Sequence, residues 1–275
     1  MRFGTHTEFT QDFYQKNMMG PSSVRILDEL CGRLELSQDM RILDLGCGTG
    51  LTSIYLAKEA GAQVFATDLW ISATGNYERF KHFGLGDKII PIHADASQPQ
   101  TTANLTGDWG TVPETGASNG LPFADEYFDA IISIDAYYYF GTGKDYLDSR
   151  IAPLLKKDGV LAVSTPGLQR EFGGNVPEEM KPFWVDEVNA AFHDMEWWKS
   201  LWGQSQAMTI TDTFTHTCHA LAWEDWLVCD NPYAAGDRDM MKAENGRYFT
   251  THGLIARKRR SAPDLFQTDI PCHEL

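Results

Sequence analysis

A glycine-rich turn follows an apolar run in the segment RILDLGCGTG, residues 41–50. A dinucleotide-binding fingerprint has the spacing G-x-G-x-x-G, and its third glycine position is occupied here by Leu51. A P-loop is excluded as well, because no Gly-Lys-Ser/Thr follows the turn. The spacing G-x-G-x-G instead leaves a bare backbone on which a ligand part without phosphate can lie against a strand end.

Three acidic side chains accompany successive apolar runs. Asp44 stands just before the turn, where its carboxylate can pair with an amino group. Asp68 ends the next run, at the place where a carboxylate can accept both hydroxyls of a ribose. Asp95, followed by Ala96, ends the third run and is placed to meet an adenine amino group. A ligand with an amino acid part, a ribose and an adenine but no phosphate is S-adenosylmethionine.

The elements that must position these residues alternate between strand and helix patterns. This alternation predicts an α/β fold, a Rossmann-like, doubly wound and mostly parallel sheet of seven strands with helices on both faces. The expected strands cover 40–48, 62–70, 88–96, 126–140, 160–167, 207–216 and 248–258, and the expected helices cover 51–61, 76–84, 145–159, 184–203 and 219–228.

The chain divides into three expected parts. Residues 1–35 form an N-terminal helical cap, in which Gly20-Pro21 interrupts two helical patterns. Residues 36–260 form the main domain, and residues 261–275 form a tail. Within the main domain, 97–120 is an insertion rich in Thr, Gly, Asn and Pro, and 166–228 is an elaboration expected beside the acceptor. The insertion is either a mobile loop near the site or a tolerated addition.

With these motifs in this order, the sequence resembles the class I S-adenosylmethionine-dependent methyltransferases over roughly residues 25–260. The resemblance is carried by DLGCGTG, the acid in FATDL, HADA and LPFADEYFDAIIS. The resemblance implies that residues 36–260 form a methyltransferase domain. The resemblance and the residue types together imply these cofactor-binding positions: Asp44, Gly46, Gly48 and Gly50 for the amino acid part, Asp68 for the ribose, Asp95 and Ala96 for the adenine, and Leu69 or Trp70 packed on the base.

The end of the fourth expected strand, SIDAYYYFG at 133–141, carries the candidate catalytic groups. Three consecutive tyrosines are hard to bury together because their hydroxyls need partners, so we expect at least one to face the site. The Asp135-Ala136 pair is similar to that of small-amine N-methyltransferases, in which a His follows four residues after the Asp. Tyr139 occupies that position here, which puts a His-based proton relay in doubt. Those families also have an N-terminal aromatic residue over the transfer centre, and Tyr14 either matches it or packs in the core.

The favoured function is methyl transfer to a small-molecule acceptor, on nitrogen first and then on oxygen or sulfur. The reaction is expected to be an in-line displacement in which positioning lowers the barrier. Two alternatives stay open. One is lipid modification like that of cyclopropane-fatty-acid synthases, which the tyrosine run disfavours. The other is a noncatalytic S-adenosylmethionine-binding module.

Further acceptor contacts are expected from the C-terminal third. Arg170 and Glu171 directly follow the fifth strand and could read the charge of an acceptor. Tryptophans at 197, 198, 202, 223 and 226 either enclose a cation or fill the core. No metal site is expected, because His216-Thr217-Cys218-His219 has no second ligand pair at zinc-finger spacing.

Composition limits the partners. The formal net charge is −15, with 38 Asp and Glu against 23 Lys and Arg, so nucleic acid is not an expected partner. No stretch approaches the ~18 apolar residues of a membrane span, and the N-terminal segment has no apolar core of signal-peptide length. Five scattered cysteines are typical of free thiols in a reducing compartment, so we expect a cytoplasmic protein. The oligomeric state is left open, a homodimer included.

Overall fold

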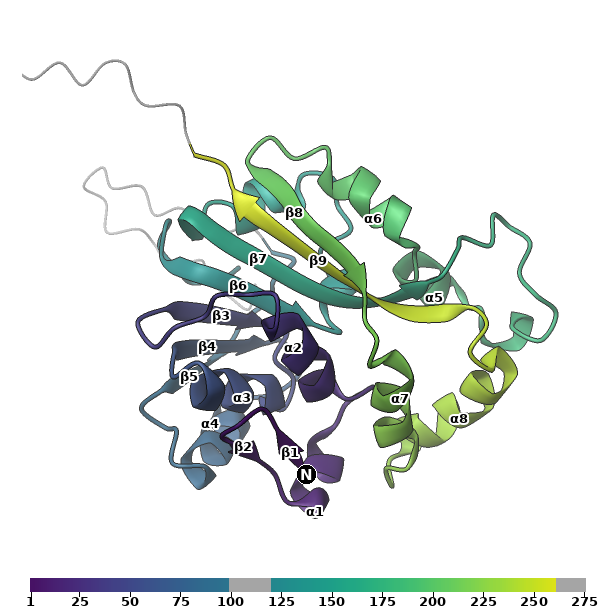
Figure 1. The fold of residues 1–275 in the computed structure, drawn as a ribbon, viewed down its shortest axis with the longest axis horizontal. Helices are drawn as coiled ribbons and strands as arrows, with labels where there is room; N and C mark the ends of the chain where they lie inside the picture. Colours follow the sequence, from purple (N-terminus) through teal and green to yellow (C-terminus); the bar gives the residue numbers. More distant parts are fainter. Residues whose placement is uncertain (99–119, 261–275) are drawn as a thin grey trace, which may run out of the picture.

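The computed structural model describes residues 1–98 and 120–260, and its centre is a seven-stranded sheet in the order β5-β4-β3-β6-β7-β9-β8 (Figure 1). Its strands are β3 (Arg41–Leu45), β4 (Gln63–Asp68), β5 (Ile89–His93), β6 (Phe128–Ile134), β7 (Leu155–Leu168), β8 (Met208–Thr215) and β9 (Phe249–Lys258). Strands β3 to β7 pair in parallel, and β9 pairs antiparallel with β7 and β8. The predicted mostly parallel sheet is confirmed.

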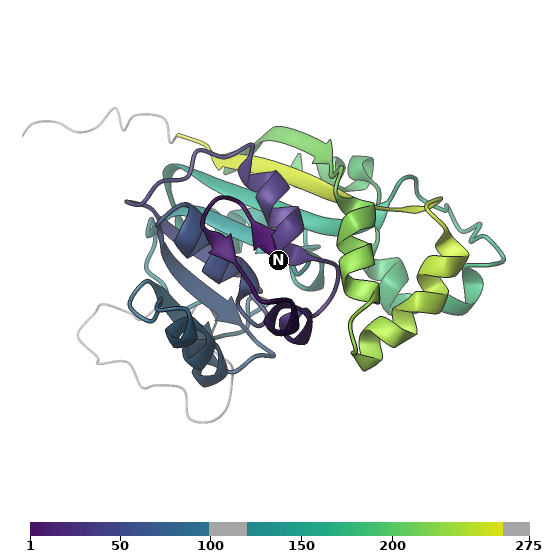
Figure 2. The same ribbon diagram turned by 60° about the horizontal axis from the view of Figure 1, so that its bottom comes forward.

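Helices cover both faces of this sheet because successive side chains of a strand point to opposite sides. Ile42 of β3 lies in a core with side chains of α2 (Ser23–Cys31), α3 (Leu51–Glu59) and α7 (His219–Leu227). Its neighbour Leu43 lies in the second core, with Trp198 and Trp202 of α6 (Met195–Trp202). In Figure 2, α2 and α7 lie on the same side of the sheet.

The N-terminal cap holds two helices, as predicted, and a small hairpin that the sequence patterns did not reveal. The hairpin pairs β1 (Arg2–Phe3) with β2 (Thr7–Glu8), and α1 (Gln11–Asn17) follows. Its turn is tied to α3, because the Glu59 carboxylate accepts hydrogen bonds from the backbone N–H groups of Thr5 and His6 at 2.9 and 2.7 Å.

Two expected helices are wrong in extent. The segment 145–159 forms only a π-helical turn, Leu147–Ile151, and β7 already begins at Leu155. Pro153 explains the early end, because it has no N–H with which to continue the helical hydrogen bonds. The segment 184–203 divides into α5 (Asp186–Ala191) and α6, whose N-cap Asp194 accepts a hydrogen bond from the Trp197 N–H.

The remaining described helices are α4 (Ala73–His82), α8 (Pro232–Glu244) and the 3-10 turns Tyr137–Tyr139 and Lys181–Phe183. Helix α8 was not anticipated, although Asn231 caps it and Pro232 begins it, a common helix start. Most of the 97–120 insertion and the whole 261–275 tail lie outside the described residues. Within the described part of the chain, no helix has the length and apolarity that crossing a membrane requires.

Candidate functional site

A cavity of about 350 Å³ opens at the carboxyl ends of β3, β4 and β6. In open α/β sheets, ligands bind where the strand order reverses, and here β3 lies between β4 and β6. The described residues that line the cavity include three aspartates, Asp68, Asp95 and Asp135, and no Lys, Arg or His. The cavity therefore suits a ligand that carries positive charge and lacks phosphate.

The glycine turn forms one wall of the cavity. Gly46, Gly48 and Gly50 have φ values of +77°, +54° and +83°, a region that other residues rarely adopt. A Cβ on Gly46 would lie 2.4 Å from the Cβ of Ala136, so the turn packs closely on the end of β6. Gly46 and Gly48 line the cavity. Gly50 stands at the start of α3, behind the cavity, and packs against the ring of Phe80.

Asp68 is held rigidly at the end of β4. Its Oδ2 accepts a hydrogen bond from the Gly48 N–H at 2.8 Å, which ties β4 to the glycine turn. Its Oδ1 accepts from the N–H groups of Trp70 and Ile71 at 2.7 and 2.9 Å. An ionised carboxylate has about four acceptor positions, so with three of them occupied the group keeps one for a ribose hydroxyl.

Asp44 lies beneath the turn and is not among the residues that line the cavity. Its Oδ2 accepts hydrogen bonds from the hydroxyls of Thr52 and Ser53 at 2.7 and 2.6 Å. Its buried Oδ1 has no hydrogen-bond partner among the described residues. Burial raises the pKa of Asp44 to about 6. The geometry assigns it to the support of the turn, and its contact with an amino group stays a prediction.

The residues expected around the adenine all line the cavity, namely Leu69, Asp95 and Ala96, together with Trp70. The Asp95 Oδ1 accepts hydrogen bonds from the backbone N–H and the hydroxyl of Ser97 at 2.9 and 2.7 Å. Leu69 and Trp70 are 41% and 64% exposed, so the cavity has an apolar rim against which a flat base can pack.

Asp135 lies at the end of β6, where the acceptor is expected. Its backbone has a φ of +55°, an uncommon conformation that aspartate tolerates better than most residues. Its N–H donates to the Ser164 carbonyl at 2.8 Å. No described group donates a hydrogen bond to its carboxylate. Burial raises the pKa of Asp135 to about 7, and the negative charge of Asp237 on α8 adds to this.

The three tyrosines after Asp135 separate into two environments. Tyr137 is buried in the second core, whereas Tyr138 and Tyr139 line the cavity. The Tyr139 ring lies 4.9 Å from that of Trp70 and 4.1 Å from that of Tyr138, centroid to centroid. At least one tyrosine was expected at the site, and two are present.

Tyr14, the third catalytic candidate, does not line the cavity. Its side chain is buried in the cap, and its hydroxyl forms a hydrogen bond with the Ser22 hydroxyl. Burial raises the pKa of Tyr14 above its ordinary value. This position matches the core-packing alternative, and a catalytic role for Tyr14 stays a prediction.

The cap contributes lining residues that sequence reasoning missed. They come from the end of α1 and the linker to α2, and are Asn17, Met19, Gly20, Pro21 and Ser23. A Cβ on Gly20 would lie 2.8 Å from the Asp135 Oδ2, so the linker covers that carboxylate closely. The Gly20-Pro21 break was the available signal, because a linker between two helices must cross the molecule somewhere.

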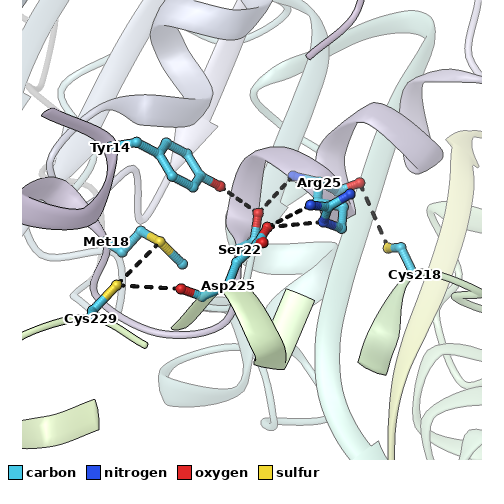
Figure 3. Close-up of polar contacts among 7 residues, drawn as sticks. All are labelled: Tyr14, Met18, Ser22, Arg25, Cys218, Asp225 and Cys229. Atoms are coloured by element: carbon cyan, nitrogen blue, oxygen red, sulfur yellow. Dashed lines mark hydrogen bonds and ion pairs between the residues drawn. The ribbon is translucent and has the colours of Figure 1, made fainter. Parts of the chain in front are cut away.

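The cap is fastened to α7 by the polar contacts drawn in Figure 3. Arg25 of α2 donates two hydrogen bonds to the Asp225 Oδ2, from Nε at 3.0 Å and Nη2 at 2.8 Å. The Ser22 N–H donates to the Ala222 carbonyl at 2.9 Å. Helix α7 therefore holds the linker over the site without lining the cavity itself.

Other expected acceptor contacts lie elsewhere. Arg170 and Glu171 line a second cavity of about 450 Å³, beside Arg247 and Tyr248. The tryptophans at 198, 202, 223 and 226 are buried in the two cores. No described lining residue of the main cavity comes from 166–228, so the acceptor role of that segment stays a prediction.

The fold and the cavity define a class I S-adenosylmethionine-binding protein. The comparison with known families agrees, since a family model described as a methyltransferase domain matches residues 15–227. The chain belongs to this methyltransferase family, and S-adenosylmethionine is its cofactor. The residues present fit S-adenosylmethionine, because the Asp68 carboxylate, the apolar rim of Leu69 and Trp70, and a glycine turn without a basic residue meet in one cavity.

Individual relatives are distant. Methyltransferase GfsG of Streptomyces halstedii is 26% identical over 165 residues, which are 57% of this chain and 51% of GfsG, so the chain spans about half of that relative. The crystal structure of a proposed sarcosine dimethylglycine methyltransferase from Galdieria sulphuraria has a TM-score of 0.63 at 18% identity and covers 86% of both chains. Geranyl diphosphate C-methyltransferase from Streptomyces coelicolor, solved with S-adenosyl-L-homocysteine, has a TM-score of 0.57 at 15% identity, covering 91% of this chain and 76% of that one. At these identities the structures show the fold alone.

Proposed function

We propose that this protein transfers a methyl group from S-adenosylmethionine to the nitrogen of a small amine. The observation that carries the proposal is the charge of the cavity, whose described lining holds three carboxylates and no basic side chain. Such a lining attracts a cationic or neutral acceptor and repels a phosphorylated or carboxylated one. A diphosphate substrate like that named for the Streptomyces coelicolor enzyme has no described basic partner there.

The acceptor end of the cavity supports nitrogen chemistry. The Asp135 carboxylate has no hydrogen-bond donor among the described residues, and a half-buried carboxylate without a partner is costly. An amine supplies both the missing hydrogen bonds and the compensating charge. The faces of Tyr138 and Tyr139 line the same cavity and can pack against the alkyl part or the positive charge of the amine.

When bound, S-adenosylmethionine supplies a methyl group on a positively charged sulfur. Asp135 would hold the acceptor nitrogen and take its proton, which frees the nitrogen lone pair for the methyl group. The carboxylate would keep that proton, and the bond of the methyl carbon to sulfur would be exchanged for a bond to nitrogen. The pKa of Asp135, about 7, suits a base that works near neutral pH. Orientation by the cap linker and Tyr139 contributes the larger part of the barrier reduction, up to about 7–11 kcal/mol in favourable cases.

The test begins with S-adenosylmethionine labelled in the methyl group and a fractionated metabolite extract, analysed by mass spectrometry. We expect the label in a small amine. Label in an alcohol, a thiol or a lipid would replace the amine assignment, and release of no labelled product would favour the noncatalytic binding module.

Two variants then test the roles within the site. Asp135→Asn and Tyr139→Phe should each lower kcat by at least tenfold and change the Kd for the cofactor by less than threefold. Tyr233→Phe, which changes an exposed tyrosine on α8 outside the described cavity lining, is the matched control and should spare kcat. Equal losses of kcat and cofactor affinity in Asp135→Asn would place this carboxylate in the cofactor contact instead.

A further inference from the structure

A cluster of three different side chains lies outside the methyl-transfer cavity. Glu29 of α2, His216 at the end of β8 and Cys218 before α7 place a carboxylate oxygen, a ring nitrogen and a sulfur within 4.8 Å of one another. The His216 Nδ1 lies 3.7 Å from the Glu29 Oε2 and 4.0 Å from the Cys218 Sγ. None of the three residues lines the cavity, so the cluster has no part in the proposed reaction.

These separations are close to those of a metal's ligands. Zinc bonds of about 2.0–2.3 Å to oxygen, nitrogen and sulfur, set at tetrahedral angles, place neighbouring ligand atoms about 3.3–3.6 Å apart. The two distances from the His216 Nδ1 exceed this by less than about 0.5 Å, and the Glu29 oxygen and the Cys218 sulfur lie within 4.8 Å of each other, so modest side-chain movements bring the three atoms to ligand spacing. We propose that Glu29, His216 and Cys218 form a Zn²⁺ site that fastens α2 to the start of α7.

The surroundings of His216 favour the ligating form of the ring. Its Nε2 forms a hydrogen bond of 2.8 Å with the Ser164 hydroxyl, which leaves Nδ1 directed toward Glu29 and Cys218. Metal-bound histidines are oriented by this kind of bond through the second ring nitrogen. The ring is buried, and a metal would bind it in its neutral form through Nδ1.

The other two ligands are also suitable. Burial raises the pKa of Glu29, but the N–H groups of Thr217 and Cys218 and the thiol outweigh it and bring the pKa down to about 2. Those N–H bonds occupy one position on each carboxylate oxygen, and a second remains on Oε2. The Cys218 Sγ lies 4.0 Å from the His216 Nδ1 and can bind the metal as a thiolate, which releases the thiol proton.

Charge and ligand type select the metal. One thiolate and one carboxylate balance a divalent ion, and the nearest arginines are already paired, Arg25 with Asp225 and Arg33 with Asp212. A mixed sulfur, nitrogen and oxygen set suits Zn²⁺ rather than Mg²⁺ or Ca²⁺, which prefer oxygen. Glu29 and Cys218 are half-buried, so water can fill the fourth position.

A metal at this site would strengthen the contact between α2 and α7, which also holds the cap in place. Cys218 already reaches α2 through its thiol, which lies 3.7 Å from the Arg25 carbonyl (Figure 3). A zinc ion bound there would link α2 and α7 in addition to the ion pair of Arg25 with Asp225. We expect the metal to stabilise the fold, because an ion that binds only the folded chain raises the melting temperature with its concentration.

Titration of the metal-stripped full chain with Co²⁺ as a spectroscopic probe tests this site. The wild-type protein should show a thiolate-to-cobalt charge-transfer band that saturates at one equivalent, and Zn²⁺ should displace the cobalt. The near-isosteric variant Cys218→Ser should lose the band and bind Zn²⁺ at least tenfold more weakly in a competition with a chromogenic chelator. Glu29→Gln should also bind more weakly, and Zn²⁺ should raise the melting temperature of wild type but not that of Cys218→Ser.

Cys229→Ser is the matched control, because Cys229 is a second free cysteine near the same cap, in contact with the Met18 sulfur at 3.7 Å. It should behave as wild type, and so should His219→Ala, whose ring bonds to Thr251 instead. Absence of the band in a folded wild-type protein would overturn the proposal, as would equal metal affinity in Cys218→Ser. Neither result depends on methyl transfer.

Discussion

Replacing Asp68 by alanine removes the carboxylate at the end of β4, and the cost to cofactor binding can be worked out from its contacts. The three backbone N–H groups that it accepts fix its position beside the glycine turn. One acceptor position then remains for a ribose hydroxyl, and a hydrogen bond to an ionised group contributes about 1.5–3 kcal/mol. This range predicts a loss of roughly 10- to 150-fold in Kd. We therefore expect a loss of more than tenfold.

Isothermal titration calorimetry with S-adenosylmethionine and with S-adenosylhomocysteine measures this loss. Asp68→Asn retains one acceptor oxygen and should fall between wild type and Asp68→Ala. Asp87→Ala, an exposed aspartate just before β5, is the control and should bind as wild type does. A folded Asp68→Ala protein with unchanged affinity for both compounds would refute the assignment of this carboxylate to the ribose.

Three further outcomes follow from other contacts. Gly50→Ala should lower the free energy of unfolding, measured by urea denaturation, by about 2–5 kcal/mol. The φ of Gly50 is +83°, and the new Cβ would lie 2.4 Å from the Phe80 ring. A loss below about 1 kcal/mol would contradict this packing. The wild-type kcat/KM should fall as the pH drops below about 7, where Asp135 becomes protonated. The pH profile of Asp135→Asn should lack this decrease. A decrease that persists in the variant would belong to another group. Arg25→Ala should cost about 1–3 kcal/mol and loosen the cap, because it leaves the half-buried Asp225 without its partner; thermal melting that matches wild type would show that the pair contributes nothing.

Most residues predicted to hold the cofactor line one cavity, and this grouping could be predicted because its signals are local. The glycine spacing and the acids at 68 and 95 sit at strand ends, and parallel strands bring their carboxyl ends to one edge of the sheet. Strand patterns that alternate with helix patterns along the sequence located all seven strands of the sheet. The 145–159 helix was wrong because a buried run containing Leu154 and Leu155 does not distinguish helix from strand by periodicity alone.

The residues predicted for the acceptor were only partly placed in the cavity. Asp135 and Tyr139 line it because they directly follow a predicted strand, and their roles stay predictions. Tyr14 was chosen from the cap by resemblance, yet the residues of the cap that line the cavity are Asn17, Met19, Gly20, Pro21 and Ser23. Which side of a helix or linker meets the sheet depends on packing with distant elements, and the short cap carries no periodic signal that settles it.

The sequence by itself determined the sheet, the glycine turn and the chemistry of its ligand, since each rests on spacing within a few residues. Only the tertiary structure decided what covers that ligand and what meets across the chain. The ring of His216 lies beside Glu29 because α7 packs on α2, almost two hundred residues away in sequence. Contacts of this kind depend on how helices dock on the sheet, and local patterns do not encode them.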